Sequence, residues 1–179
     1  DIMKMLIKSS IDLISVENVD WQFIAWRLST IDLYKKASRN RWFDIKNVYK
    51  PEVFKNFFDD YINRGLYYKD FYKFYSEEDI LKAWKYIKKD IDFTYNYTTI
   101  LNYRKRYFLN PNNIIRELPQ EMYMAIALFL AIPEKKEERL ETALKMYEYC
   151  ATWKISLPTP TILNARTNYH QLSSCFKLN

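Results

Sequence analysis

The stretch ISLPTPTILNARTNYHQLSSCF (residues 155–176) differs in character from the chain that precedes it. Its prolines and β-branched residues argue against a helix over residues 155–167, because proline lacks a backbone N–H and clashes with the preceding helical turn. LSSCFKL (172–178) is short and reads most simply as a strand. We therefore expect a largely helical chain that ends in extended elements.

Upstream of this stretch, apolar residues recur at the spacing of amphipathic helices. Met3, Ile7, Ile11 and Ile14 indicate a first helix, and Ile24, Leu28 and Ile31 indicate a second. The same reasoning predicts further helices over residues 51–64, 76–91, 92–109, 118–132 and 135–153. A short extended piece is expected near residues 107–110, and a turn at 111–113.

Two of these helices carry recognisable end signals. Pro51 suits the first turn of its helix, and Gly65 suits the exit from it. Ser76 and Asp79, three residues apart, form a weaker version of the capping box.

Composition favours a folded helical domain. The chain has 179 residues, of which 49% are hydrophobic and 18% aromatic, so a disordered tail is excluded. Its single glycine argues against phosphate-binding loops. The net charge of +6 is compatible with polyanion binding, but the lysines alternate with acids, and abundant Lys, Asn, Ile, Tyr and Phe are typical of AT-rich coding sequence.

The longest apolar run, MYMAIALFLAI (122–132), is too short to cross a bilayer and predicts a buried helix. No signal peptide is recognisable. We therefore expect a cytoplasmic protein that binds neither membranes nor nucleic acids directly.

The two cysteines, Cys150 and Cys175, are too few for a disulfide framework and lie in no metal-ligand spacing, so no metal site is predicted. Taken alone, Cys175 reads as a structural thiol, Ser173 and Ser174 as loop hydroxyls, and residues 158–160 as a rigid turn.

The order of these motifs changes that interpretation. KISLPTP, then NART, then QLSSCF (154–176) resembles the large subunit of ribonucleotide reductase. DWQFIAWRL (20–28) and DFTYNY (92–97) resemble helical segments of the same family, so the resemblance covers essentially the whole chain. It implies a helical N-terminal domain (1–153), followed by the start of a ten-stranded α/β barrel (154–179).

The resemblance also implies roles for three residues. Cys175 matches the first of two redox-active cysteines, which become a disulfide as the ribose 2′-hydroxyl leaves. Its partner would lie downstream of residue 179, as would the radical-forming cysteine. Thr159 and Ser174 match residues that contact the nucleoside diphosphate.

Three other residues receive more ordinary interpretations. Arg166 stands where many family members have glycine, and arginine tolerates positive φ poorly, so the geometry of this loop is open. His170 is interpreted as a loop residue and Cys150 as a core thiol.

At most the last helices of the family's ATP-binding cone could be present, so no overall-activity site is assigned.

The complete enzyme would need groups that this chain lacks. It would need a radical generator, which is a metal-containing small subunit in the aerobic class or cobalamin in a related class, and nucleotide effectors. Expected partners are the remaining barrel polypeptide, the small subunit, thioredoxin or glutaredoxin, and a second catalytic unit. The chain would be inactive alone, either as a split-gene product or as a fragment. The alternative is a non-catalytic helical binding module or a regulatory relic of a reductase.

Overall fold

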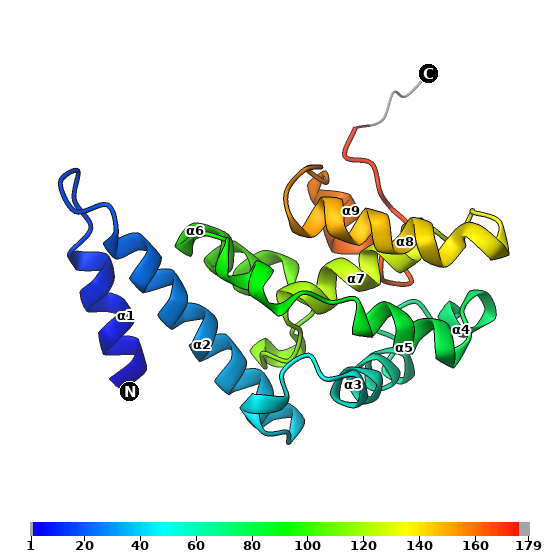
Figure 1. The fold of residues 1–179 in the computed structure, drawn as a ribbon, viewed down its shortest axis with the longest axis horizontal. Coiled ribbons are helices and arrows are strands. Elements are labelled where there is room, and N and C mark those ends of the chain that lie inside the picture. The colour runs from blue at the N-terminus through cyan, green and yellow to red at the C-terminus, as the bar shows by residue number, and fades with distance from the viewer. Residues whose placement is uncertain (1, 176–179) are drawn as a thin grey trace. The chain divides into compact units, whose positions relative to one another are not determined.

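The computed structural model describes residues 2–175, and this part of the chain contains helices but no strand. It divides into two compact units (Figure 1). The first unit contains the residues up to Val48 together with Lys89–Leu118. The second contains Tyr49–Lys88 together with the residues from Pro119 onward. Each unit is thus assembled from two separate stretches of sequence.

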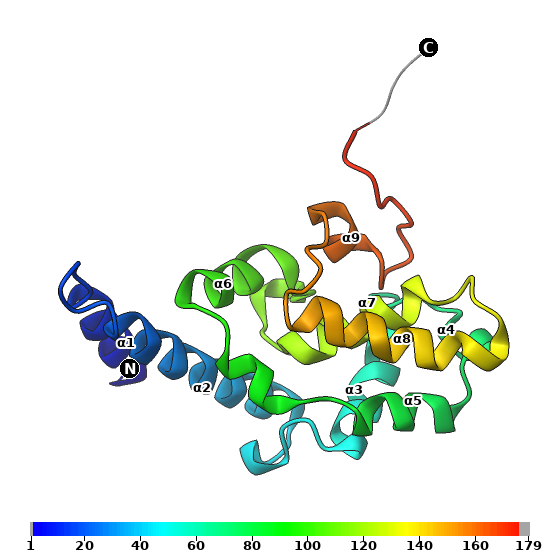
Figure 2. The same cartoon turned by 45° about the horizontal axis from the view of Figure 1, so that its top comes forward.

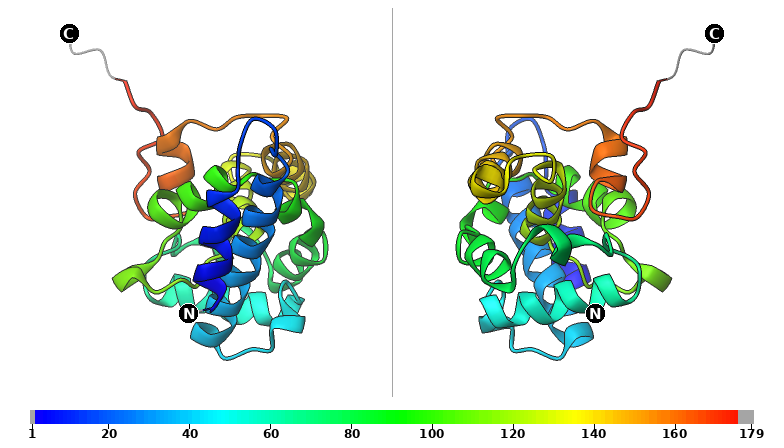
Figure 3. Two further views of the ribbon diagram at one scale, coloured as in Figure 1. Left: turned by 90° about the vertical axis from the view of Figure 1, so that its left-hand side faces the viewer. Right: turned by 90° about the vertical axis from the view of Figure 1, so that its right-hand side faces the viewer.

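The first unit is built on an antiparallel helix pair. Helices α1 (Ile2–Asp12) and α2 (Trp21–Arg41) lie side by side (Figures 1 and 3). The remaining elements are α6 (Tyr97–Asn102), the 3₁₀ turns η1 (Ile45–Asn47), η2 (Lys89–Phe93) and η4 (Pro111–Asn113), and the π-helical turn η3 (Tyr103–Tyr107).

The predicted helix containing Ile24 and Leu28 is confirmed, but its buried face is different. Ile24 is 42% exposed, whereas Ala25, Leu33 and Ala37 are completely buried. The small side chains of Ala25 and Ala37 allow a neighbouring helix to approach α2 closely. Two hydrogen bonds also tie α2 to Asp92. The Trp26 indole donates to the Asp92 carbonyl (3.2 Å), and the Tyr34 hydroxyl donates to the Asp92 carboxylate (2.5 Å).

The continuous helix predicted over residues 92–109 is wrong. The structure has the turn η2, then α6, then η3. Asn96 explains the restart, because its side chain accepts a hydrogen bond from the Thr99 amide (2.9 Å) and so caps a new helix.

The second unit contains six helices among the described residues. These are α3 (Pro51–Asn63), α4 (Phe71–Phe74), α5 (Glu77–Lys85), α7 (Pro119–Leu130), α8 (Lys136–Ala151) and α9 (Thr159–Asn164). Helix α7 is buried along nearly its whole length, as the apolar run predicted, and it packs against α8. No described helix is both long and apolar enough to cross a membrane.

An aromatic cluster forms much of the core of this unit. Phe58, Tyr61, Tyr67 and Phe71 are all completely buried. The Tyr67 ring centroid lies 5.5 Å from that of Phe58 and 5.1 Å from that of Tyr61, both edge to face, as aromatic pairs prefer. The core thereby fixes Tyr67 and the turn on which it lies.

The predicted end of α3 and the predicted start of α5 are confirmed, whereas the helix predicted to reach residue 91 ends at Lys85. Gly65 ends α3 with φ of 70°, a backbone conformation that glycine adopts without a Cβ clash. At α5, the Ser76 hydroxyl accepts from the Asp79 amide (3.1 Å), while the Ser76 amide donates to the Asp79 carboxylate (2.9 Å).

The absence of helix predicted for residues 155–167 is wrong, because α9 forms there. Pro158 adopts an extended conformation at the N-cap, and Pro160 occupies the first turn, where a missing N–H costs no helical hydrogen bond. Within the predicted strand, residues 172–175 are not a strand, since the described residues contain no strand with which they could pair. Residues 176–178 lie outside the described residues.

Candidate functional site

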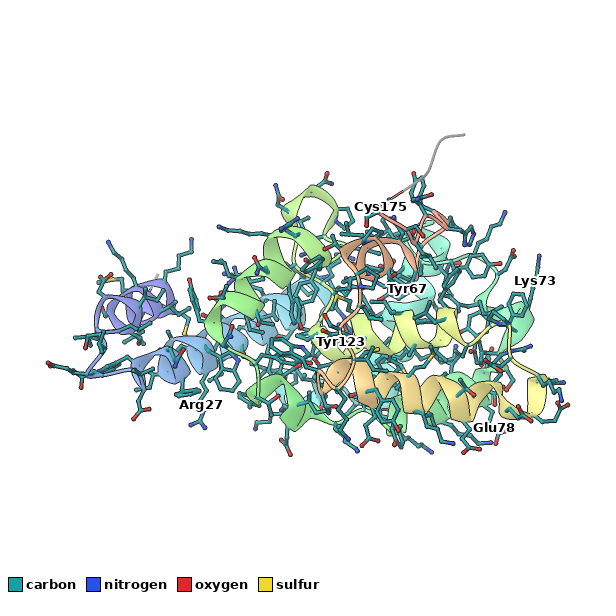
Figure 4. All side chains as sticks on the ribbon, turned by 90° about the horizontal axis from the view of Figure 1, so that it is seen from above. Arg27, Tyr67, Lys73, Glu78, Tyr123 and Cys175 are labelled. Atoms are coloured by element: carbon teal, nitrogen blue, oxygen red, sulfur yellow. The ribbon has the colours of Figure 1, made fainter. Side chains whose placement is uncertain are left out.

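The segment after α9 carries the cysteine singled out by the sequence. Cys175 is an exposed free thiol, and its sulfur lies 3.7 Å from the Ser174 hydroxyl (Figure 4). Ser174 is exposed as well, whereas Thr159, the first residue of α9, is half-buried. The structure therefore brings Ser174 and Cys175 together at the end of the segment, while Thr159 lies at the start of α9.

Helix α9 holds this segment through two side chains. The Thr161 hydroxyl donates to the Leu172 carbonyl (3.3 Å), and the Asn164 amide group donates to the Gln171 carbonyl (2.7 Å). The Gln171 side chain in turn donates to the Ser173 carbonyl (2.8 Å). The last anchored residue thus immediately precedes Ser174 and Cys175.

A second set of hydrogen bonds ties the segment to the turn that follows α3. The Tyr68 amide donates to the Arg166 carbonyl (2.8 Å). The Asn168 side chain donates to the carbonyls of Gly65 and Tyr67 and accepts from the Lys69 amide, each at 3.1 Å. Nothing in the sequence points to Asn168, because its partners lie about a hundred positions away.

The position of Arg166 in the motif left open whether its backbone is strained, and the structure shows that it is not. It is absent from the residues with positive φ, and its side chain is completely buried. Its guanidinium donates to the Ile162 carbonyl of α9. Arg166 therefore helps to tie the loop to α9 without backbone strain.

His170 lies in the loop as an exposed residue that packs on aromatic rings. Its ring stacks on Phe129 at a centroid distance of 5.3 Å and meets Tyr68 edge to face at 5.2 Å. These contacts give His170 a packing role in the segment that leads to Cys175.

Cys150 contrasts with Cys175. It is buried on α8, and burial raises the pKa of its thiol to about 11. Because the thiolate is the reactive form, Cys150 is inert near neutral pH. Residues 2–175 contain no cluster of three or more His, Cys, Asp or Glu side chains that could hold a metal ion. The segment that ends at Cys175, in contrast, presents an accessible thiol beside the Ser174 hydroxyl.

Comparison with known proteins identifies the family. Residues 91–170 match the family model described as "Ribonucleotide reductase, all-alpha domain". The chain is 36% identical, over 98% of its length, to the ribonucleoside-diphosphate reductase subunit alpha of Helicobacter pylori. This chain belongs to the ribonucleotide reductase large-subunit family.

Other reductase relatives align over a similar extent. The chain is 30% identical to the ribonucleoside-diphosphate reductase 1 subunit alpha of Escherichia coli and 30% identical to the subunit alpha of Enterobacteria phage T4. Each alignment covers 98% of this chain. The chain spans only about a fifth of the length of these relatives, with 21% of the Helicobacter protein and 22% of the other two aligned.

Proposed function

We propose that this chain is the N-terminal part of a ribonucleotide reductase catalytic subunit that reduces ribonucleoside diphosphates to deoxyribonucleotides. The observation that carries the proposal is alignment over 98% of the chain with relatives named as the alpha subunit of that enzyme. The exposed thiol of Cys175, at the end of an anchored segment, is consistent with it. In this proposal, residues 154–179 begin the barrel, and its first strand pairs with strands outside this chain.

The proposed chemistry uses Cys175 as a reductant. A thiyl radical on a downstream cysteine removes the ribose 3′ hydrogen and later returns it. Cys175 and a second downstream cysteine each give up one electron and one proton, and an S–S bond forms between them. The C2′–O bond breaks, a C2′–H bond forms, and the hydroxyl leaves as water.

Two hydroxyl residues are proposed to contact the substrate. Ser174 lies beside Cys175, so a ribose or phosphate oxygen near the thiol would be within its reach. Thr159 begins α9, the helix that holds the Cys175 segment through Thr161 and Asn164. Hydroxyl groups suit such contacts because each can donate or accept a hydrogen bond.

The remaining components are proposed to lie outside this chain. They are the rest of the barrel, a radical-generating small subunit or a cobalamin, nucleotide effectors, thioredoxin or glutaredoxin to reduce the disulfide, and a second catalytic unit. The cytoplasm, where such reductants keep thiols reduced, is the proposed location.

The test is ribonucleoside diphosphate reduction by the complete catalytic subunit that contains this chain, assayed with its radical generator and a dithiol reductant. We expect Cys175→Ser to lower steady-state turnover by at least about a hundredfold. Cys150→Ser is the matched control, because it changes the same atom at a buried position, and it should stay within about twofold of wild type. An inactive wild type, or a Cys175→Ser variant as active as Cys150→Ser, would contradict the proposal.

A further inference from the structure

Asn168 uses every polar group of its side chain in one clamp. A carboxamide has two N–H donors and a carbonyl acceptor. The Asn168 side-chain nitrogen donates to the Gly65 and Tyr67 carbonyls, and its oxygen accepts from the Lys69 amide. All three partners are backbone groups of a single turn, so the clamp fixes the loop against that turn.

The turn that receives the clamp is itself held in place. Gly65 ends α3, with its amide donating to the Ile62 carbonyl (2.9 Å). Tyr67 is completely buried against Phe58 and Tyr61. Because close-packed interiors move little, this turn provides a rigid reference for the loop bound to it.

The clamp lies at the start of the segment that leads to Cys175. Figure 2 shows the course of this segment after α9. Beyond Asn168, the His170 ring packs on Tyr68 and Phe129, and α9 holds the carbonyls of Gln171 and Leu172. Residues 168–172 are therefore anchored on both sides, and Cys175 follows three residues later. If the clamp is lost, the backbone between Asn168 and Cys175 keeps the local hydrogen bond from the Tyr169 amide to the Thr167 hydroxyl (3.0 Å) and its contacts at residues 170–173.

We propose that Asn168 is a positioning residue that fixes the Cys175 segment and so sets the rate of substrate reduction. This inference rests on the proposed function. Asn168 touches neither the thiol nor, in the proposal, the substrate, and it acts through residues 169–173. The rate of substrate reduction depends steeply on the position of the thiol relative to the ribose, since misplacement by about 1 Å can lower a reaction rate about a hundredfold.

The sharpest variant is Asn168→Asp. It preserves the shape and the acceptor for the Lys69 amide, but it removes both donors and places a carboxylate oxygen against the Gly65 and Tyr67 carbonyls. The matched control is Asn63→Asp, which makes the same change at an exposed position near the end of α3. Both variants are made in the complete catalytic subunit.

Two measurements test the role. In hydrogen–deuterium exchange, Asn168→Asp should speed exchange at least tenfold in residues 66–69 and 166–173 and leave the rest of the chain unchanged. In the reductase assay, the variant should lower kcat at least tenfold with KM within about twofold, because the thiol is displaced while substrate contacts remain. Asn63→Asp should match wild type in both measurements.

The outcomes separate the two proposals. If Asn168→Asp leaves exchange unchanged or has the kcat of wild type, the positioning role is overturned. The proposed function still stands in that case, provided that the wild type is active. Faster exchange throughout the chain would also overturn it, since Asn168 would then only stabilise the fold. An inactive wild type would overturn the proposed function, and exchange would then decide whether Asn168 fixes the segment.

Discussion

Cys150 and Cys175 have the same side chain in two different environments. Cys150 is 4% exposed on α8, whereas Cys175 is exposed at the end of a loop segment. Burial disfavours the charged thiolate, so the pKa of Cys150 rises from its ordinary value of 9.0 to about 11. Reactivity at these two positions is therefore decided by burial.

This contrast predicts a pH profile. In a Cys175→Ser variant, where Cys150 is the remaining thiol, the rate of iodoacetamide alkylation should rise with a midpoint near pH 11 in the folded protein. In urea the midpoint should fall toward the ordinary value near pH 9, because water then solvates the thiolate. Equal midpoints in the two states would contradict the burial argument.

The same shift affects stability in a definite direction. Between the unfolded pKa of 9.0 and the folded value of about 11, the unfolded chain releases the Cys150 proton first. Since the folded state then binds more protons, this thiol's contribution to stability is complete below pH 9 and is lost as the pH rises through about 11.

At the scale of single elements, helix ends are set by a few local hydrogen bonds. The capping box of α5 satisfies two backbone groups that would otherwise have no partner at the helix start. Asn96 satisfies one such backbone group, the Thr99 amide, at the start of α6. These polar side chains therefore decide where α5 and α6 begin.

The cap of α5 gives a direct stability prediction. Ser76→Ala should lower the free energy of unfolding by about 1 kcal/mol, because the Asp79 amide loses its acceptor. Urea denaturation followed by circular dichroism measures this as a lower midpoint at an unchanged slope. Ser156→Ala, at an exposed position outside the helices, is the control and should have almost no effect. A cap variant as stable as this control would show that the capping box contributes nothing.

Local signals in the sequence predicted several elements but not all. The C-terminal end of α3 and the start of α5 were predictable because Gly65 and Ser76 act within a few residues of themselves. Helix α9 was missed because proline at a helix start looks the same in sequence as proline that prevents a helix. The buried face of α2 was misassigned because tertiary packing selects Ala25 and Leu33 over the more apolar Ile24.

At the scale of the whole molecule, the two units combine stretches that are distant in sequence. No local pattern signals such an arrangement, and the boundary expected after residue 153 remains a prediction. The clamp at Asn168 was hidden for the same reason, since its partners at Gly65, Tyr67 and Lys69 come from the other stretch of the second unit. The motif around Cys175, in contrast, is local in sequence, and it pointed to the family that the comparisons show. The role of Cys175 itself stays a prediction.

The role of Cys175 as the reductant is tested most directly by a single turnover without an external reductant. The complete, pre-reduced catalytic subunit and its radical generator are mixed with a ribonucleoside diphosphate, quenched, alkylated and analysed by peptide mass spectrometry. We expect Cys175 to be recovered in a disulfide with a downstream cysteine, in proportion to the deoxyribonucleotide formed, while Cys150 remains a free thiol. Product formation with Cys175 still reduced would contradict its role as the reductant.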